Sequence, residues 1–267
     1  MRITIIGSGN MGGAIALGLA KGTIVNASDI TCTARSEETL ARLKAANAAL
    51  NVTTDNRAAV RTADWVILAV KPWLVESVIR EIRPAFDLER QVILSVAAGI
   101  TLAQLEEFLS KRKMDEELID PRIIRVMPNT AIAVGSSMTF ICEQRARQEE
   151  IDLALRLFNE LGHAMLIEEK QMDAAMALAS CGIAYALRYI RAAMAGGVEL
   201  GIRPREAQEI VSYTVKGAAD LLLANGSHPE TEIDKVTTPG GITIKGLNEM
   251  EAAGFTSAVI RGLKASK

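Results

Sequence analysis

The chain has few of the residues that bind metals or form disulfides, and it has no excess of either charge. Its 267 residues include two histidines, His163 and His228, and three widely spaced cysteines, Cys32, Cys142 and Cys181. None of them has the spacing of a metal-ligand set, so we expect no metal site. An odd number of scattered cysteines fits the reducing cytoplasm, where we expect the protein. The net charge of −2 gives no electrostatic case for nucleic acid or an anionic membrane.

Long apolar runs are also absent. No stretch reaches the roughly 20 residues of a membrane-spanning helix. The apolar run that begins at Arg2 is interrupted by Gly7, Gly9 and Gly12, and no cleavage region of a signal peptide follows. The chain is long enough for one large or two modest domains, with ample apolar content for a core. We therefore expect a soluble protein without a membrane partner.

A glycine turn stands near the start of the chain. The β-branched run Arg2–Ile6 is followed by Gly7-Ser8-Gly9-Asn10-Met11-Gly12 and by an Ala- and Leu-rich segment, Met11–Lys21. This order predicts a strand, a tight turn and a helix that Gly22 ends as a C-cap. In such a turn the first glycine allows the bend, the second lets a pyrophosphate reach the backbone and the third permits close helix–strand packing. The context favours a dinucleotide site over a glycine-rich turn without a ligand.

The next expected strand, residues 30–33, ends in Arg35 and Ser36. An NAD site usually has an acidic residue at this strand end, where it binds the ribose 2′-hydroxyl. Asp29 stands before the strand, at the wrong end. Arg35 and Ser36 could instead hold a 2′-phosphate, although a surface Arg-Ser at a helix start is the plain alternative. The missing acid favours NADPH, with NADH possible but weaker.

Further apolar runs predict strands at residues 65–70, 91–96, 123–126, 138–142 and 164–167, with helical segments between them. Near-continuous apolar strands alternating with helices indicate a parallel sheet covered on both faces, with ligands at the carboxyl ends of the strands. Thr101 and Gln104 form the pattern of a capping box that starts a helix to Leu109. The charged stretch 111–120 reads as a solvated loop. The fold class is α/β, with a Rossmann-type dinucleotide-binding domain over residues 1–167.

Residues 168–267 have only helical patterns. A long Ala-, Met- and Leu-rich segment, 170–195, is interrupted at 180–182, and a second helix from Arg203-Pro204 ends at Asn225-Gly226. A last helical stretch surrounds residues 255–264. About one hundred residues of small helices bury little by themselves. We therefore expect an all-helical domain that forms a homodimer, and possibly a higher homo-oligomer, by pairing with a second copy.

The turn Val236–Ile244 lies in this helical half. Pro239 suits the first turn of a helix, because it lacks an N–H group and its φ is fixed. Gly240 and Gly241 would let a ligand approach the bare backbone. The amides at such a helix start, flanked by the hydroxyls of Thr238 and Thr243, suit a small carboxylate. Ordinary capping of a helix is the alternative from this stretch alone.

Together these segments resemble the pyrroline-5-carboxylate reductases, and the resemblance covers nearly the whole chain. The Met-Pro-Asn and Thr-Pro-Gly-Gly-x-Thr pieces are its most specific elements. The resemblance rests on the motifs Gly7–Gly12, Asp55-Asn56, Ala69–Pro72, Ser95–Gly99, Arg125–Thr130, Val236–Ile244 and Gly254-Phe255.

The resemblance implies an NADPH-dependent oxidoreductase that reduces the C=N bond of 1-pyrroline-5-carboxylate, giving proline in the last step of its biosynthesis. It implies that the substrate carboxylate is held by the amides near Gly240, Gly241 and Ile242 and by the Thr238 hydroxyl. Thr243 would reach the ring nitrogen as the catalytic group, either relaying a proton or orienting the imine, unless it is only a second capping threonine. The implied cofactor contacts are Gly7, Ser8, Gly9, Asn10, Met11, Gly12, Arg35, Ser36, Asn56, Ala69, Val70, Lys71 and Ala97.

One segment departs from the family pattern. Where members read Ser-Gly-Ser-Gly-Pro-Ala-Tyr, this chain has Ala179–Tyr185, and Arg188 and Arg191 follow it. The departure keeps two alternatives open: a relative that acts on another small cyclic imine, and an NADP(H)-binding sensor or scaffold without turnover. A hydroxyacid dehydrogenase of the same plan would carry a lysine in the first long helix of its second domain. Residues 180–195 contain no lysine, which argues against that enzyme.

The cofactor preference gives a first prediction. Replacing Arg35 with alanine should weaken NADPH binding by roughly 1–3 kcal/mol, because a charged hydrogen bond to the 2′-phosphate is lost. NADH lacks this phosphate and should be affected less. Fluorescence titration of both cofactors measures the difference, and equal losses for the two would contradict the assignment of Arg35.

Overall fold

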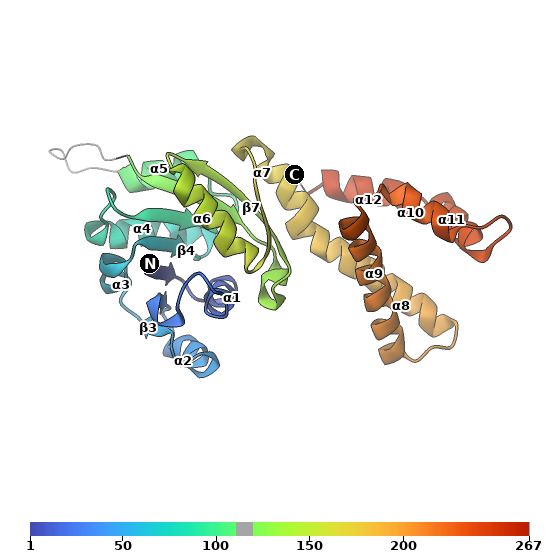
Figure 1. The fold of residues 1–267 in the computed structure, drawn as a ribbon, viewed down its shortest axis with the longest axis horizontal. Coiled ribbons are helices and arrows are strands. Elements are labelled where there is room, and N and C mark those ends of the chain that lie inside the picture. Colours follow the sequence, from blue (N-terminus) through green and yellow to red (C-terminus); the bar gives the residue numbers. More distant parts are fainter. Residues whose placement is uncertain (111–119, 267) are drawn as a thin grey trace. The chain divides into compact units, whose positions relative to one another are not determined.

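A computed structural model describes residues 1–110 and 120–266 of the chain. The chain forms two compact units, Met1–Met176 and Ala177–Lys267 (Figure 1). The functional division expected at residue 168 stays a prediction. The charged stretch expected to be a loop, 111–120, lies outside the described residues except for Asp120. Within the described ranges, no helix has the length and apolar character that crossing a bilayer requires.

The first unit is built on an eight-stranded sheet in the order β3-β2-β1-β4-β5-β6-β7-β8. All neighbouring strands are parallel except β6 and β7, which pair antiparallel. The expectation of a parallel sheet is therefore wrong at this one pair, because only a short connection, with a single 3-10 turn, joins the two strands. The strands are β1 (Ile3–Ile6), β2 (Ile30–Thr33), β3 (Asn51–Thr53), β4 (Trp65–Leu68), β5 (Val92–Ser95), β6 (Arg122–Met127), β7 (Ser137–Gln144) and β8 (Gly162–Leu166).

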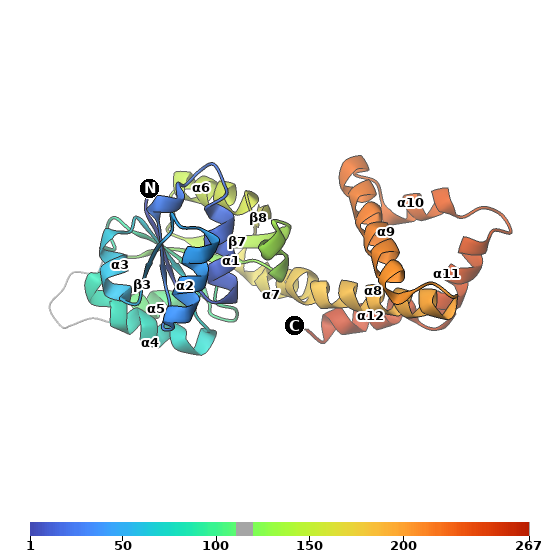
Figure 2. The ribbon, with the colours of Figure 1, turned by 90° about the horizontal axis from the view of Figure 1, so that it is seen from below.

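Helices cover both faces of this sheet, with α1 on one side and α3 on the other (Figure 2). The α-helices of the unit are α1 (Asn10–Leu19), α2 (Glu37–Ala46), α3 (Asn56–Thr62), α4 (Val75–Ile82), α5 (Leu102–Ser110), α6 (Gln148–Asn159) and α7 (Met172–Met176). Short 3-10 turns join them at η1 (Ala27–Asp29), η2 (Pro72–Leu74), η3 (Arg83–Ala85), η4 (Thr130–Val134) and η5 (Glu169–Gln171).

One layer of the core lies between the sheet and the helices α1 and α6. Ile3 and Ile5 of β1 point to this face, where they meet Leu19 of α1 and Phe158 of α6, all four without exposed surface. Alternate residues of a strand share one face of the sheet, and residues three or four apart share one face of a helix. The apolar pattern of the sequence therefore suffices to place these side chains inside.

Of the two helix caps predicted at Thr101 and Gly22, the structure has one. The capping box of α5 is confirmed, since the Thr101 amide donates to Gln104 Oε1 at 2.9 Å and the Gln104 amide donates to Thr101 Oγ1 at 3.2 Å. The C-cap assigned to Gly22 is wrong, because α1 ends at Leu19 and its cap residue, Ala20, is right-handed. Gly22 instead lies under the Glu160 carboxylate, where a Cβ would collide with the carboxylate oxygens.

The second unit contains helices throughout. The chain runs without a break from α7 through a π-helical turn, Ala177–Cys181, into α8. The interruption expected at residues 180–182 is thus a widened turn and not a gap. The other helices are α8 (Gly182–Glu199), α9 (Pro204–Asn225), α10 (Pro229–Val236), α11 (Ile242–Ala252) and α12 (Phe255–Lys264). As expected, Pro204 opens α9, and left-handed Gly226, with φ 61°, ends it.

Few contacts hold this unit together. Helices α8 and α9 pack against each other, Tyr189 meets the Phe255 ring edge to face with centroids 6.4 Å apart, and the Tyr185 hydroxyl donates to the Gly262 carbonyl at 3.2 Å. Among its described residues, only Ala177 and Ala207 are buried. The unit therefore has almost no core of its own, and many of its large apolar side chains are exposed.

Candidate active site

The glycine turn brings two stretches of bare backbone together at the end of β1. Gly7 has φ of 92°, which strongly favours glycine, and a Cβ there would lie 2.6 Å from Val70 Cγ1. A Cβ on Gly12 would collide with the Gly7 carbonyl oxygen and approach the Ala69 Cβ to 2.9 Å. A Cβ on Gly9 would meet no atom within 4 Å. The outer two glycines are therefore required by packing, and the middle one leaves open space at the start of α1.

A polar chain links this turn to α3 and α4. The Thr33 carbonyl accepts the amides of Gly7 at 3.2 Å and Ser8 at 2.7 Å. The Thr33 hydroxyl donates to Asn56 Oδ1 at 2.6 Å, and Asn56 Nδ2 donates to Glu81 Oε1 at 3.2 Å. Asn56, expected at the cofactor, is thus fixed beside the glycine turn. Sequence reasoning missed Thr33 and Glu81, although a threonine that ends an apolar strand is a usable signal.

Arg35 and Ser36 lie where β2 passes into α2. Ser36 is the N-cap of α2, and its Oγ accepts the Thr39 amide at 3.4 Å. Arg35 is exposed, and no acidic side chain of the described chain pairs with it. Glu37 and Glu38 occupy the first turn of α2 and oppose an anion there. An unpaired arginine beside a helix N-terminus nevertheless offers a phosphate a direct partner.

The turns after β4 and β5 lie at the same carboxyl end of the sheet as the glycine turn. Both strands end earlier than expected, at Leu68 and Ser95, so that Ala69–Lys71 and Ala97 lie in turns. Ala69 packs against the glycine turn, and the amide of buried Ala97 donates to Ser95 Oγ at 3.4 Å. Because β1 lies between β2 and β4 in the sheet, the predicted cofactor residues that follow these strands meet at the carboxyl ends of the strands.

The turn 236–244 belongs to the second unit and is described there by itself. Gly240 has φ of 72°, and the Gly241 amide donates to the Thr238 carbonyl at 2.9 Å. Helix α11 begins at Ile242 with Gly241 as its N-cap, so Pro239 precedes the helix and does not form its first turn, contrary to expectation.

This geometry decides which amides can meet a ligand. The first amides of a helix, here those of Ile242, Thr243 and Ile244, have no partner within the helix. The Gly241 amide is already used in the turn. Thr238 and Thr243 are both exposed beside the free amides. The arrangement offers an anion backbone donors and two hydroxyls.

The segment that departs from the family pattern, Ala179–Tyr185, begins in the π-helical turn Ala177–Cys181 and continues into the first turn of α8. Its Ser180 hydroxyl is buried without a hydrogen-bond partner, and the free thiol of Cys181 is partly buried. Arg188 and Arg191 follow on α8, and both are exposed. π-Turns inside helices occur frequently at functional sites.

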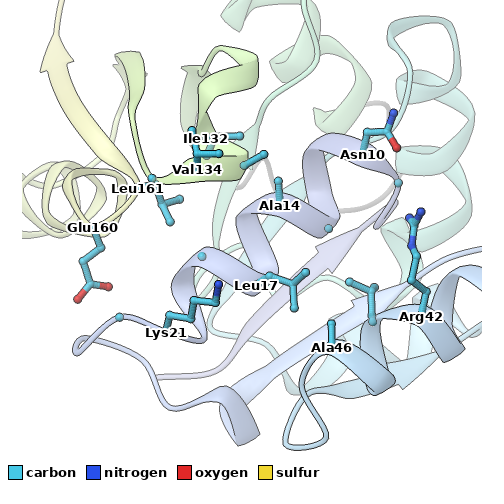
Figure 3. Close-up of a pocket in the computed structure, with 17 residues that line it drawn as sticks. Asn10, Ala14, Leu17, Lys21, Arg42, Ala46, Ile132, Val134, Glu160 and Leu161 are labelled. Atoms are coloured by element: carbon cyan, nitrogen blue, oxygen red, sulfur yellow. The ribbon is translucent and has the colours of Figure 1, made fainter. Parts of the chain in front are cut away.

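A groove of about 670 Å³ runs along α1 in the first unit (Figure 3). Ala14 and Leu17 of α1 lie in it, Val134 lies on one side and Arg42 of α2 on the other. Only its end at Gly9 and Asn10 touches the glycine turn, so the groove is not the crevice at the strand ends. The described residues contain no group of three His, Cys, Asp or Glu side chains that could hold a metal ion.

The fold and the glycine turn define a class, the oxidoreductases with a Rossmann-type dinucleotide-binding domain. A family model described as "NADP oxidoreductase coenzyme F420-dependent" matches residues 2–99. A second model, "Pyrroline-5-carboxylate reductase dimerisation", matches residues 169–267, so the helical half is a dimerisation domain. The chain belongs to the pyrroline-5-carboxylate reductase family.

Relatives support this assignment along the whole chain. Pyrroline-5-carboxylate reductase of Methanosarcina acetivorans is 36% identical, and the match covers 100% of this chain and 97% of that protein. Pyrroline-5-carboxylate reductase 1 of Dictyostelium discoideum is 39% identical over 99% of this chain, which spans about half (48%) of that longer protein. The crystal structure of the Plasmodium falciparum reductase with NADP bound matches with a TM-score of 0.86 at 27% identity, over 100% of this chain and 95% of that one.

The three glycines give a prediction that separates packing from ligand binding. Gly12→Ala should destabilise the first unit by about 1–3 kcal/mol, because the Cβ meets backbone that cannot move aside. Gly9→Ala should leave thermal stability nearly unchanged and weaken NADPH binding by on the order of ten-fold or more, because its methyl group would stand where the pyrophosphate approaches. Thermal unfolding and fluorescence titration measure the two effects. Normal NADPH affinity in the folded Gly9 variant would contradict this placement of the cofactor.

Proposed function

We propose that the chain reduces 1-pyrroline-5-carboxylate to proline with a nicotinamide dinucleotide, NADPH in preference to NADH. The observation that carries this proposal is the match to pyrroline-5-carboxylate reductases over both units of the chain. Family membership leaves no role for the hydroxyacid dehydrogenase alternative. Steady-state oxidation of NADPH with pyrroline-5-carboxylate tests the activity, and an absence of turnover with intact NADPH binding would favour the sensor or scaffold alternative.

The residues at the strand ends fit a dinucleotide. Open space at Gly9 and the free amides at the start of a ten-residue helix suit a pyrophosphate. Arg35 and the Ser36 hydroxyl suit a 2′-phosphate, and Asn56 is held in place by Thr33. The turns Ala69–Lys71 and Ala97 would border the nicotinamide end. When bound, NADPH supplies the hydride of the reduction.

The turn before α11 would hold the substrate carboxylate. Three free amides at a helix N-terminus carry the positive end of the helix dipole, which favours an anion there. The Thr238 hydroxyl adds a donor, and it lies over Gly241, where a Cβ would stand only 2.6 Å from Oγ1. The absence of a side chain at Gly241 thus keeps Thr238 in position.

Reduction of a cyclic imine needs little chemistry from the protein. The imine nitrogen must carry a proton, and its carbon must face the hydride donor, so orientation and electrostatics supply most of the rate. We assign Thr243 the contact to the ring nitrogen, because Thr243 is the residue directly after Ile242, whose amide would bind the carboxylate. The π-turn and Arg188 would then adjust which ring size and substituents fit, and a six-membered cyclic imine carboxylate is the competing substrate to compare.

The helical domain supports the proposal that the protein is an obligate homodimer. We place this dimer in the cytoplasm. The exposed apolar residues of the domain include Leu187, Ile210 and Leu221. The family model that matches this domain describes dimerisation. The three described thiols are free, which fits a reducing compartment.

Obligate pairing predicts that unfolding depends on protein concentration, because dissociation exposes the apolar helix faces. Thermal unfolding at several concentrations and sedimentation at nanomolar protein measure this. A folded monomer that persists at nanomolar concentration would refute the proposal.

Thr243→Val tests the assignment of the ring-nitrogen contact. The substitution keeps the shape but removes the hydroxyl, so kcat/KM should fall by on the order of ten- to a thousand-fold while NADPH affinity is retained. Thr231→Val is the matched control, since Thr231 is an exposed helical threonine of the same unit, on α10. The control should be unaffected; equal activity of the two variants would show that Thr243 only caps the helix.

A further inference from the structure

A charged side chain is buried in the middle of the sheet. Arg125 lies on β6 between β5 and β7, with 4% of its side chain exposed. Its Nε atom is buried without a partner. The thiol of Cys142, opposite it on β7, does not compensate the charge, because burial, and secondarily the charge of Glu169, raises the pKa of Cys142 to about 12. Burial of a guanidinium is costly, so its position calls for a reason other than packing.

The reason is a three-way junction at Glu169. Oε1 of this residue accepts Arg125 Nη1 at 2.8 Å and also the amide of Leu102 at 2.8 Å. Leu102 is the first residue of α5, where amides lack helical partners and a carboxylate is favoured by the helix dipole. One carboxylate therefore joins the sheet, the start of α5 and the start of η5.

The junction holds the start of α5 and the start of η5 to β6. The start of α5 follows directly on the turn Ala97–Thr101, which borders the nicotinamide in the proposed function. Glu169 opens η5, from which the chain runs through α7 and the π-turn into α8. Only the arginine of this pair is buried, since 33% of the Glu169 side chain is exposed. An ion pair with a buried member often adds little stability over an apolar pair, but it can fix one arrangement of its partners.

We propose that Glu169 and Arg125 are positioning residues for the nicotinamide end of the cofactor. Glu169 holds the N-terminus of α5 to β6. It thereby keeps the preceding turn, Ala97–Thr101, in the position in which it would contact the dinucleotide. This inference rests on the proposed function only for the identity of the ligand.

The same strand provides a matched control. At the opposite end of β6, Arg122 pairs with Glu150, with 11% and 10% of the two side chains exposed. Glu150 also accepts a helix-start amide, that of Arg147 at 2.8 Å. Both glutamates thus join an arginine of β6 to a helix N-terminus, but only Glu169 lies at the carboxyl ends of the strands.

The experiment compares Glu169→Ala with Glu150→Ala in the full-length protein. Hydrogen exchange of the cofactor-free protein should accelerate at residues 97–105 in the Glu169 variant alone. Its Kd for NADPH should rise and its kcat should fall, each by on the order of ten- to a hundred-fold, as for a small displacement of a positioned group. Glu150→Ala should lose thermal stability to a similar extent but keep both constants. Glu169→Gln, which retains an acceptor of the same shape, should recover part of the NADPH affinity and serves if the alanine variant does not fold.

Unchanged NADPH affinity in the folded Glu169 variants, or an equal loss in the Glu150 variant, would overturn the positioning role. These readouts stay distinct from the proposed reaction. If wild-type protein fails to reduce pyrroline-5-carboxylate but Glu169→Ala still loses NADPH affinity and exchange protection, the junction stands and only the substrate is wrong.

Discussion

The contact of backbone on backbone between the glycine turn and the end of β4 is the constraint on which the first unit depends. Gly12 lies against the Gly7 carbonyl and the Ala69 Cβ, and Gly7 lies against Val70 and the Ala69 carbonyl, so neither glycine has room for a side chain. This approach sets the distance of α1 from the sheet, and with it the packing of Leu19 against β1. It also places the start of α1 level with the turns after β4 and β5. The same close approach thus serves the core and the crevice.

The two units support their candidate anion-binding amides in opposite ways. In the first unit, buried Thr33 at the end of β2 holds both Asn56 and the glycine turn by hydrogen bonds, so the support of the candidate site is buried. In the second unit, the amides before α11 stand on helices with almost no core. The chain itself supplies little burial there, and the family model that matches this unit is one of dimerisation.

Much of the fold could be predicted from periodicity, whereas most of the candidate site residues came from the family resemblance and stay predictions. The strands around the glycine turn and the helix from Pro204 follow directly from apolar runs and from proline and glycine signals. The antiparallel direction of β7 was missed, because the composition of a buried strand does not give its direction and only the short connection from β6 indicates it. Strand β3 is too short and polar to stand out. Gly22 and Pro239 were misassigned because their local signals are real, but tertiary contact with Glu160 and the tight turn at Thr238 determine their roles. The junction at Glu169 joins residues that are far apart in sequence, so no local sequence pattern predicts it.

The two edges of the sheet have unequal chemistry. Strand β3 is three residues long and has the sequence Asn-Val-Thr, so it offers another chain a short and polar edge. Strand β8 is longer, and its Met165 and Leu166 are 44% and 46% exposed. Natural sheets avoid long apolar edges because these recruit further strands. Of the two edges of this sheet, β8 is therefore the one more open to pairing with a further strand, since β3 is short and polar.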